Sequence, residues 1–166
     1  MNTVNKVSGG LFAAWAAHDL EELYTIVGTS KQLFPRMPKW LPLPPRLRSE
    51  GVSQTHVNVA LSIMAVLVAL AAAEGKRTGG ASPLFRGALL VFGLHGFTHI
   101  LTAVIAGRYT TGVATSPIIV IPYWIYARRA LRAEGLRDND LQAIAIAALV
   151  LPVLVLVHVV SWFLTK

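Results

Sequence analysis

Residues 11–27 read LFAAWAAHDLEELYTIV, and the motif HDLEE at positions 18–22 interrupts an apolar run that is almost long enough to cross a bilayer. A charged group at the bilayer centre costs roughly 2.5–3.5 kcal/mol on insertion scales, so ionisable side chains inside such a segment indicate a functional site. Successive side chains on an α-helix are about 100° apart, which places His18, Glu21 and Glu22 on one face. We therefore predict a helix whose polar face meets protein and whose opposite face meets lipid.

The overall composition also indicates a membrane protein. The chain has 166 residues, of which 54% are hydrophobic and 14% are charged. Soluble domains carry about 25% charged residues. Several further apolar runs approach the roughly 20 residues of a transmembrane helix. We predict an all-α fold, a polytopic helical bundle in the membrane.

Charge and cysteine content exclude several classes of function. The formal net charge is +7, but the basic residues lie mainly in the connections between apolar runs, where membrane proteins usually keep them. We therefore expect membrane lipid, and no nucleic acid, as the partner of these residues. The chain has no cysteine, which excludes disulfides, thiolate metal ligands and thiol redox chemistry.

The chain is predicted to form one membrane domain, residues 1–166, with about five transmembrane segments. The fourth segment is short and carries Pro117 and Pro122, so it either spans with the help of flanking residues or re-enters from one side. The connection 28–51 contains five prolines and cannot form a continuous helix, so it is either an interfacial linker or a lid over the site. The predicted apolar segments are 11–27, 52–73, 84–107, 113–127 and 141–164.

Two observations about the number of spans conflict. With five spans the basic residues are nearly balanced across the membrane, whereas four spans, with 113–127 re-entrant, place most of them on one side. Charge alone therefore favours four spans. Five spans instead bring Glu22, His56, His99 and His158 to a similar depth. We give the common depth more weight, because five histidines inside apolar segments are hard to explain as scatter.

Two pairs of side chains have the spacing of metal ligands on a helix. Glu22 follows His18 by four positions and His99 follows His95 by four, so each pair is stacked on one helix face. Imidazole and carboxylate together suit zinc, iron or manganese, and helical bundles build di-metal sites from such inward-facing groups. A metal ion would also neutralise carboxylates that are costly to bury. The candidate metal ligands are His18, Glu22, His56, His95, His99 and His158.

Other interpretations of these residues remain open. A single intramembrane histidine is more often a hydrogen-bonding partner between helices than a ligand, and chains of histidine and glutamate also relay protons. His158 is the weakest candidate ligand and could instead orient another imidazole. Thr25, Thr102 and Ser116 could contact a substrate, although hydroxyls in membrane helices usually bond to their own backbone.

The HDLEE motif in the first apolar segment, followed by isolated histidines in later ones, resembles the HXXEE domain family, a group of small bacterial integral membrane proteins of uncharacterised function. The family motif corresponds to His18, Glu21 and Glu22. The resemblance implies that the family covers most of the chain and that the protein lies in a bacterial inner (plasma) membrane, but it implies no activity. A fainter likeness to intramembrane zinc hydrolases of the ceramidase type rests on the scattered histidines and the HxxxH pair. That activity is not transferred, because this chain has fewer spans and uses glutamates.

Two classes of function fit these residues. The first is a metal-dependent enzyme that acts on an apolar or lipid-like small molecule, with one or two divalent metal ions, zinc or iron, as the cofactor. A zinc centre lowers the pKa of bound water and favours hydrolysis, whereas a di-iron centre on the same ligands would make the protein an oxidoreductase. We expect a hydrolase, because membrane di-iron hydroxylases carry more histidines than the five present here. Glu21 is the candidate catalytic residue, acting as a general base beside the ligand Glu22.

The second class is a carrier or sensor of metal ions or protons. The chain is short and has no internal duplication of the kind common in secondary transporters, although a homo-oligomer could supply the missing half. Haem held by two histidines is a third reading of the same residues. The carboxylates beside His18 are poor neighbours for haem, and the chain has no cysteine pair for covalent attachment.

Overall fold

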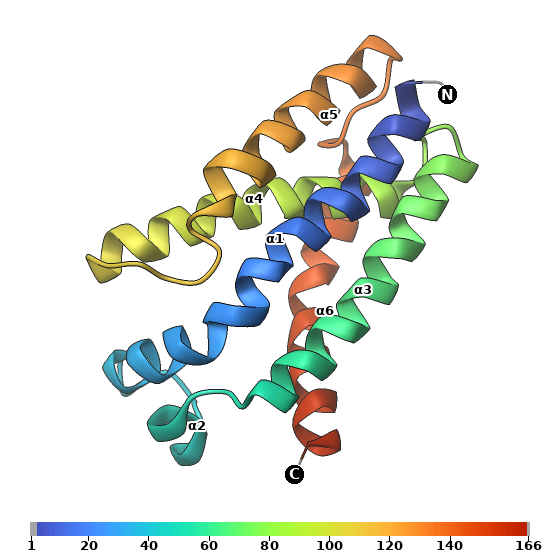
Figure 1. Cartoon of the computed structure of the whole chain (residues 1–166). Coiled ribbons are helices and arrows are strands. Elements are labelled where there is room, and N and C mark those ends of the chain that lie inside the picture. Colours follow the sequence, from blue (N-terminus) through green and yellow to red (C-terminus); the bar gives the residue numbers. More distant parts are fainter. Residues whose placement is uncertain (1–2, 166) are drawn as a thin grey trace.

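The computed structural model describes residues 3–165, and this part of the chain folds into helices joined by loops, without β-strands. The long helices run back and forth, with the N-terminus at one end of the bundle and the C-terminus at the other (Figure 1). The predicted all-α fold is therefore confirmed. The elements are α1 (Thr3–Leu33), the 3₁₀ turn η1 (Phe34–Arg36), α2 (Pro45–Glu50), α3 (Gln54–Arg77), α4 (Pro83–Ala106), the π-helical turn η2 (Ser116–Val120), α5 (Ile121–Ala133) and α6 (Leu141–Leu164).

Sequence signals at the helix ends explain where three of the helices begin. Ser53, Ser82 and Asp140 each precede a helix, and each side-chain oxygen accepts a hydrogen bond from the backbone N–H three residues later. Pro83 occupies the first turn of α4, where a missing N–H is tolerated. Gly107 ends α4 with a left-handed φ of 61°, a conformation that glycine adopts without steric cost. The chain therefore leaves α4 sharply, and the loop that follows turns back toward α1.

Three helices, α3, α4 and α6, are long and apolar enough to cross a membrane. They correspond to the predicted segments 52–73, 84–107 and 141–164. The segment 11–27 lies inside α1, which carries charged residues in its middle. The segment 113–127 is divided among a loop, η2 and α5. The helical membrane bundle is thus confirmed with three helices of spanning character, and the crossing of the other two segments stays a prediction.

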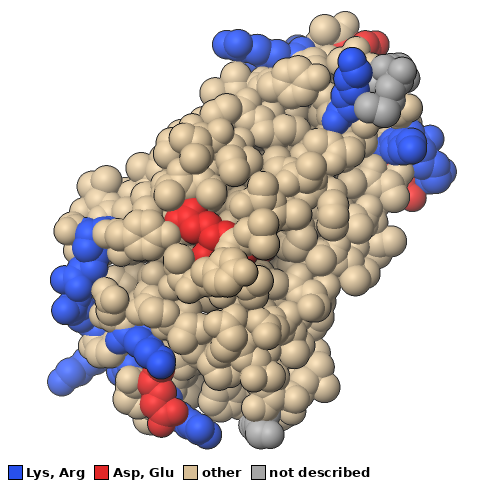
Figure 2. Space-filling model, in the orientation of Figure 1, with Lys and Arg blue, Asp and Glu red and all other residues tan. Residues whose placement is uncertain are grey.

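The distribution of charge agrees with a bundle whose middle is embedded in the membrane. On the face shown in Figure 2, lysine and arginine gather at the two ends of the molecule, and the broad middle is uncharged apart from one acidic patch. Large apolar side chains are exposed along α6, including Leu151, Val155 and Leu156 at 60–70% of their surface. Such a continuous apolar surface is stable against lipid but not against water.

The packing of α1 against α4 and α5 fixes the position of the polar motif. Leu11 and Leu89 are almost completely buried between these helices. Gly96 of α4 permits the close approach of η2, since an added Cβ would lie 2.9 Å from the Val120 side chain. Gly93 does the same for α5, because its added Cβ would collide with the Trp124 ring. As a result the second half of α4 lies beside both the middle of α1 and the loop that leads to η2.

Candidate metal centre

Four side chains from α1 and α4 form a compact cluster. His18 and Glu22 come from α1, and His95 and His99 come from α4. One ring nitrogen or carboxylate oxygen from each residue lies within 4.8 Å of the others. Ligands about 2.0–2.2 Å from a zinc ion lie on the order of 3–4 Å apart, so small side-chain movements would bring these four groups onto one ion. His18, Glu22 and His99 are buried, with exposed fractions of 0%, 8% and 8%, whereas His95 is partly exposed.

The polar atoms of this cluster converge on one another. His99 Nε2 lies 3.1 Å from Glu22 Oε1 and 2.7 Å from His95 Nε2, and His95 Nε2 lies 3.9 Å from the same carboxylate oxygen. At most one proton can lie between the two imidazole nitrogens. Because lone pairs that face each other in a buried site are unfavourable, a proton or a cation must lie among them. A divalent metal ion would satisfy all three groups at once.

The tautomer of His18 follows from its hydrogen bonds. His18 Nδ1 lies 2.7 Å from Thr115 Oγ1, and the Thr115 hydroxyl donates its proton to Glu21 Oε2 at 2.5 Å. The hydroxyl has one proton, so the His18 ring must donate from Nδ1. Nε2 then carries a lone pair, and in the described part of the chain this buried atom has no hydrogen-bond partner. An imidazole fixed in this way presents the nitrogen that a metal ion binds.

Glu21 ties the loop between α4 and η2 to α1. Its carboxylate accepts hydrogen bonds from the Ala114 and Thr115 backbone N–H groups, at 3.2 and 2.8 Å, and from the Tyr109 hydroxyl. Burial, with the hydrogen bond to Glu21, raises the pKa of Tyr109, so its phenol keeps the proton that it donates. The structure thus shows Glu21 engaged with the loop, and the general-base role expected for it stays a prediction.

Further contacts hold the same loop over the cluster. Thr111 Oγ1 lies 2.8 Å from Thr25 Oγ1, and the Thr111 N–H donates to Thr29 Oγ1 at 3.0 Å. Gly112, with φ of 74°, packs against the His99 ring so closely that an added Cβ would lie 2.6 Å from two ring atoms. The loop therefore fixes two of the four imidazole and carboxylate groups, His18 through Thr115 and His99 through Gly112.

The sequence did not indicate Thr115, Tyr109 or Gly112 as site residues. Polar residues in a connection between apolar segments are common, and nothing local to them specifies the helix that they contact. The three hydroxyl side chains that could contact a substrate instead bond to their own backbone, as hydroxyls in membrane helices usually do. Thr25, Thr102 and Ser116 each donate a hydrogen bond to the backbone carbonyl four residues earlier.

His56 and His158 are not among the four clustered residues, and they contact each other. His56 Nε2 lies 2.9 Å from His158 Nδ1, and the rings are stacked with an interplanar angle of 7°. This contact joins α3 to α6, and the five-span arrangement stays a prediction. It is also the imidazole-orienting contact that was the alternative for His158. The ligand role expected for both residues stays a prediction.

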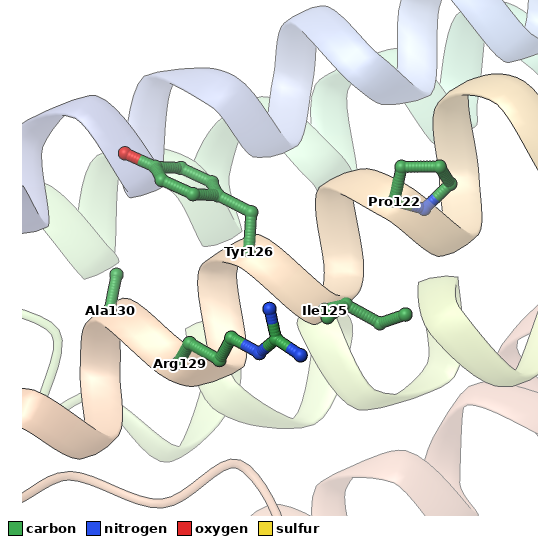
Figure 3. Close-up of a pocket in the computed structure, with 5 residues that line it drawn as sticks. All are labelled: Pro122, Ile125, Tyr126, Arg129 and Ala130. Carbon is green, nitrogen blue, oxygen red and sulfur yellow. The ribbon is translucent and has the colours of Figure 1, made fainter.

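The outer face of α5 carries a shallow hollow of about 500 Å³ that is separate from the cluster. Its lining side chains all stand on this one helix (Figure 3). Arg129 and Tyr126 are its two polar lining residues, and the other three are apolar. Binding sites combine concavity with convergent polar groups, so this hollow is a poor candidate for one.

Comparisons with known proteins agree with the central place of the motif. A family model described as "Protein of unknown function with HXXEE motif" matches residues 10–127. The matched region contains His18, Glu22, His95 and His99 together with the loop that covers them, whereas His158 lies outside it. No curated protein and no solved structure matches the chain.

Proposed function

The chain belongs to the HXXEE family, whose function is unknown, and we propose that it is a membrane-embedded, metal-dependent enzyme that acts on an apolar or lipid-like small molecule, with hydrolysis as the favoured reaction. His18, Glu22, His95 and His99 would hold a divalent ion, zinc or iron. The location would be a bacterial plasma membrane, which the three apolar helices support without specifying the compartment.

One observation carries the proposal. His18 Nε2 is buried without a hydrogen-bond partner in residues 3–165, and its ring lies beside His95 and His99, with centroid distances of 5.3 and 5.0 Å. A buried polar atom without a partner costs about 1–3 kcal/mol, and a bound ion is one of the ways in which a protein recovers this cost. The Thr115 hydroxyl keeps the lone pair on Nε2 and so prepares this atom for a cation.

The side chains around the cluster have separate tasks in this proposal. A bound divalent metal would supply a Lewis acid and lower the pKa of water at the site. Thr115 fixes the His18 tautomer, and Gly112 with its loop covers the His99 side and keeps bulk water out. Glu21 could act as the general base only after exchanging the hydrogen bonds from Thr115 and Tyr109, so such a step would require movement of the loop.

The exposure of the four residues indicates the side from which a substrate would approach. The His95 side chain is 37% exposed, while those of Glu22 and His99 are 10% exposed. Leu94 and Phe97 flank His95 on α4 and are 50% and 46% exposed. An apolar entry of this kind favours a substrate that arrives through the bilayer.

A metal carrier or sensor is the second candidate, and the number of protein ligands favours it. Four protein ligands fill a tetrahedral zinc site, whereas catalytic zinc usually has three and an open position. Iron accepts more ligands than four, so an oxidoreductase with iron also keeps open positions on these residues. The distinction between enzyme and sensor therefore depends on which metal is bound.

Elemental mass spectrometry of the purified protein tests the proposal. We expect about one zinc or iron ion per chain, retained after dialysis against a weak chelator. The Asn58→Ala variant is the control, because Asn58 is exposed on α3 and bonds to Gln54 at 3.0 Å, outside the cluster. Absence of any stoichiometric metal from protein folded in detergent would refute the metal centre and the enzyme built on it.

A further inference from the structure

A second cavity lies at the end of the bundle where α2, the start of α3 and the end of α6 meet. Its volume is about 160 Å³. Its lining shares no residue with the four-residue cluster. Its lining includes Arg46, Glu50, Ser53, His56 and Trp162.

The wall of this cavity contains a buried polar group that lacks a partner. His56 is 6% exposed, and its Nε2 contacts His158 at 2.9 Å. Its Nδ1 is buried and has no hydrogen-bond partner among the described residues. Either tautomer leaves this nitrogen as an unused donor or acceptor. Buried polar atoms are rarely left in this state, so a ligand in the cavity is expected to complete it.

The mouth of the cavity presents one positive and one negative side chain. Arg46 Nε lies 3.0 Å from Glu50 Oε2, and the two side chains are 75% and 62% exposed. An exposed pair of this kind contributes little to stability, so both partners can be re-paired by a ligand. A guanidinium binds phosphate oxygens through two parallel hydrogen bonds, and a carboxylate accepts hydrogen bonds from an ammonium group. A ligand with both charges would satisfy both residues.

The surroundings of the cavity fit an amphiphile. Trp162 lies in its wall, and tryptophan is enriched where membrane meets water. Above it lies α6, which is more exposed than α3 or α4: only 11% of its most apolar 18-residue stretch is buried. Val159 and Val160 are 44% and 38% exposed there. Lipid chains can lie along this surface while the small cavity admits only a head group.

We propose that this cavity binds the zwitterionic head group of a phospholipid with a primary ammonium, of the phosphatidylethanolamine type. The phosphate pairs with Arg46 and accepts a hydrogen bond from His56 Nδ1, and the ammonium donates hydrogen bonds to Glu50. A primary ammonium has N–H donors, whereas the quaternary ammonium of choline has none and is bulkier. The inference is independent of the metal centre and of the proposed enzyme activity.

Native mass spectrometry of the full chain in detergent tests the proposal, with phosphatidylethanolamine, phosphatidylglycerol and phosphatidylcholine of identical acyl chains as probes. Arg46→Gln and Glu50→Gln remove the two charges one at a time. Arg77→Gln is the matched control, since it breaks the exposed pair of Arg77 with Glu74 at the other end of α3. Circular dichroism confirms that each variant folds.

We expect phosphatidylethanolamine to bind most tightly, and each cavity variant to weaken it about tenfold, because each removes a charged hydrogen-bonding partner. The control should bind like the unaltered chain. Equal binding in all variants would overturn the site. Equal affinity for phosphatidylglycerol, insensitive to Glu50→Gln, would overturn the zwitterionic specificity. Displacement by an equal concentration of soluble glycerophosphoethanolamine would overturn the assignment to a lipid, whose chains add affinity along α6.

Discussion

His18 Nδ1 lies 2.7 Å from Thr115 Oγ1, although 97 positions separate the two residues in the chain. The hydrogen bond joins the family motif on α1 to the loop before η2. It holds the imidazole in the tautomer whose Nε2 faces the cluster. The candidate centre is therefore a motif together with the loop that orients it.

The first prediction concerns the ligands on α1. His18→Ala or Glu22→Ala should remove most of the bound metal, because each takes one donor from the cluster of four. Metal content per chain, measured on folded protein, checks this. Unchanged stoichiometry in both variants would show that the pair is structural.

The second prediction concerns the residue that orients His18. Thr115→Val keeps the shape of the side chain but removes the hydroxyl that contacts His18 and Glu21. Loss of such an orienting partner typically lowers metal affinity about 10–100-fold. Competition with a chelator measures this change. Thr115→Ser keeps the hydroxyl and should bind metal like the unaltered chain; an equal loss in both variants would argue against the tautomer mechanism.

The third prediction separates the two roles available to Glu21. Glu21→Gln keeps an oxygen that accepts a hydrogen bond from Thr115 but cannot accept a proton. If Glu21 is the general base, turnover should fall about 10²–10⁴-fold while the metal stays bound. Metal content and turnover are measured on the same preparation, once a substrate is known.

Two outcomes of that experiment would change the assignment. If Glu21→Gln loses its metal while Glu22→Gln keeps it, Glu21 is the ligand and Glu22 the base. Normal turnover in both variants would favour a carrier or sensor over an enzyme.

The fourth prediction concerns the contact between the loop and His99. Gly112→Ala forces a left-handed φ on a residue with a Cβ and brings that Cβ into the His99 ring. Gly107→Ala is the matched control, because it has a similar φ of 61° and no atom within 4 Å of the added Cβ. In both variants the free energy of unfolding should fall by about 1–2 kcal/mol, because alanine is strained in the left-handed conformation. Only Gly112→Ala should also weaken metal binding. Equal metal affinity in the Gly112→Ala and Gly107→Ala variants would show that Gly112 does not contribute to the site.

The fifth prediction concerns His158. Because its ring nitrogen pairs with His56 and it is not one of the four clustered residues, His158→Ala should leave the metal content unchanged. Elemental analysis of this variant beside His18→Ala makes the comparison. Loss of metal from both would support the ligand role that the sequence predicts for His158.

Local sequence features determined much of this protein. The apolar segments, the low charge and the helix caps specify a helical membrane bundle, since bilayer thickness and backbone hydrogen bonding leave few alternatives. Side chains four residues apart share a helix face. The spacing of His18 with Glu22, and of His95 with His99, therefore also specified two pairs of candidate ligands, one pair on each of two helices. These are properties of single helices, so they can be predicted from the sequence of each helix without knowing which helices pack against it.

Only the tertiary structure decided which candidate ligands from different helices come into contact. His95 and His99 lie against Glu22 because glycines in α4 allow η2 and α5 to pack closely, and His56 pairs with His158 across α3 and α6. The same packing brings the Glu21 carboxylate to the loop, where Thr115 and Tyr109 donate hydrogen bonds to it. Helix periodicity fixes the direction of a side chain about its own axis, but the partner in that direction depends on the crossing of helices distant in sequence.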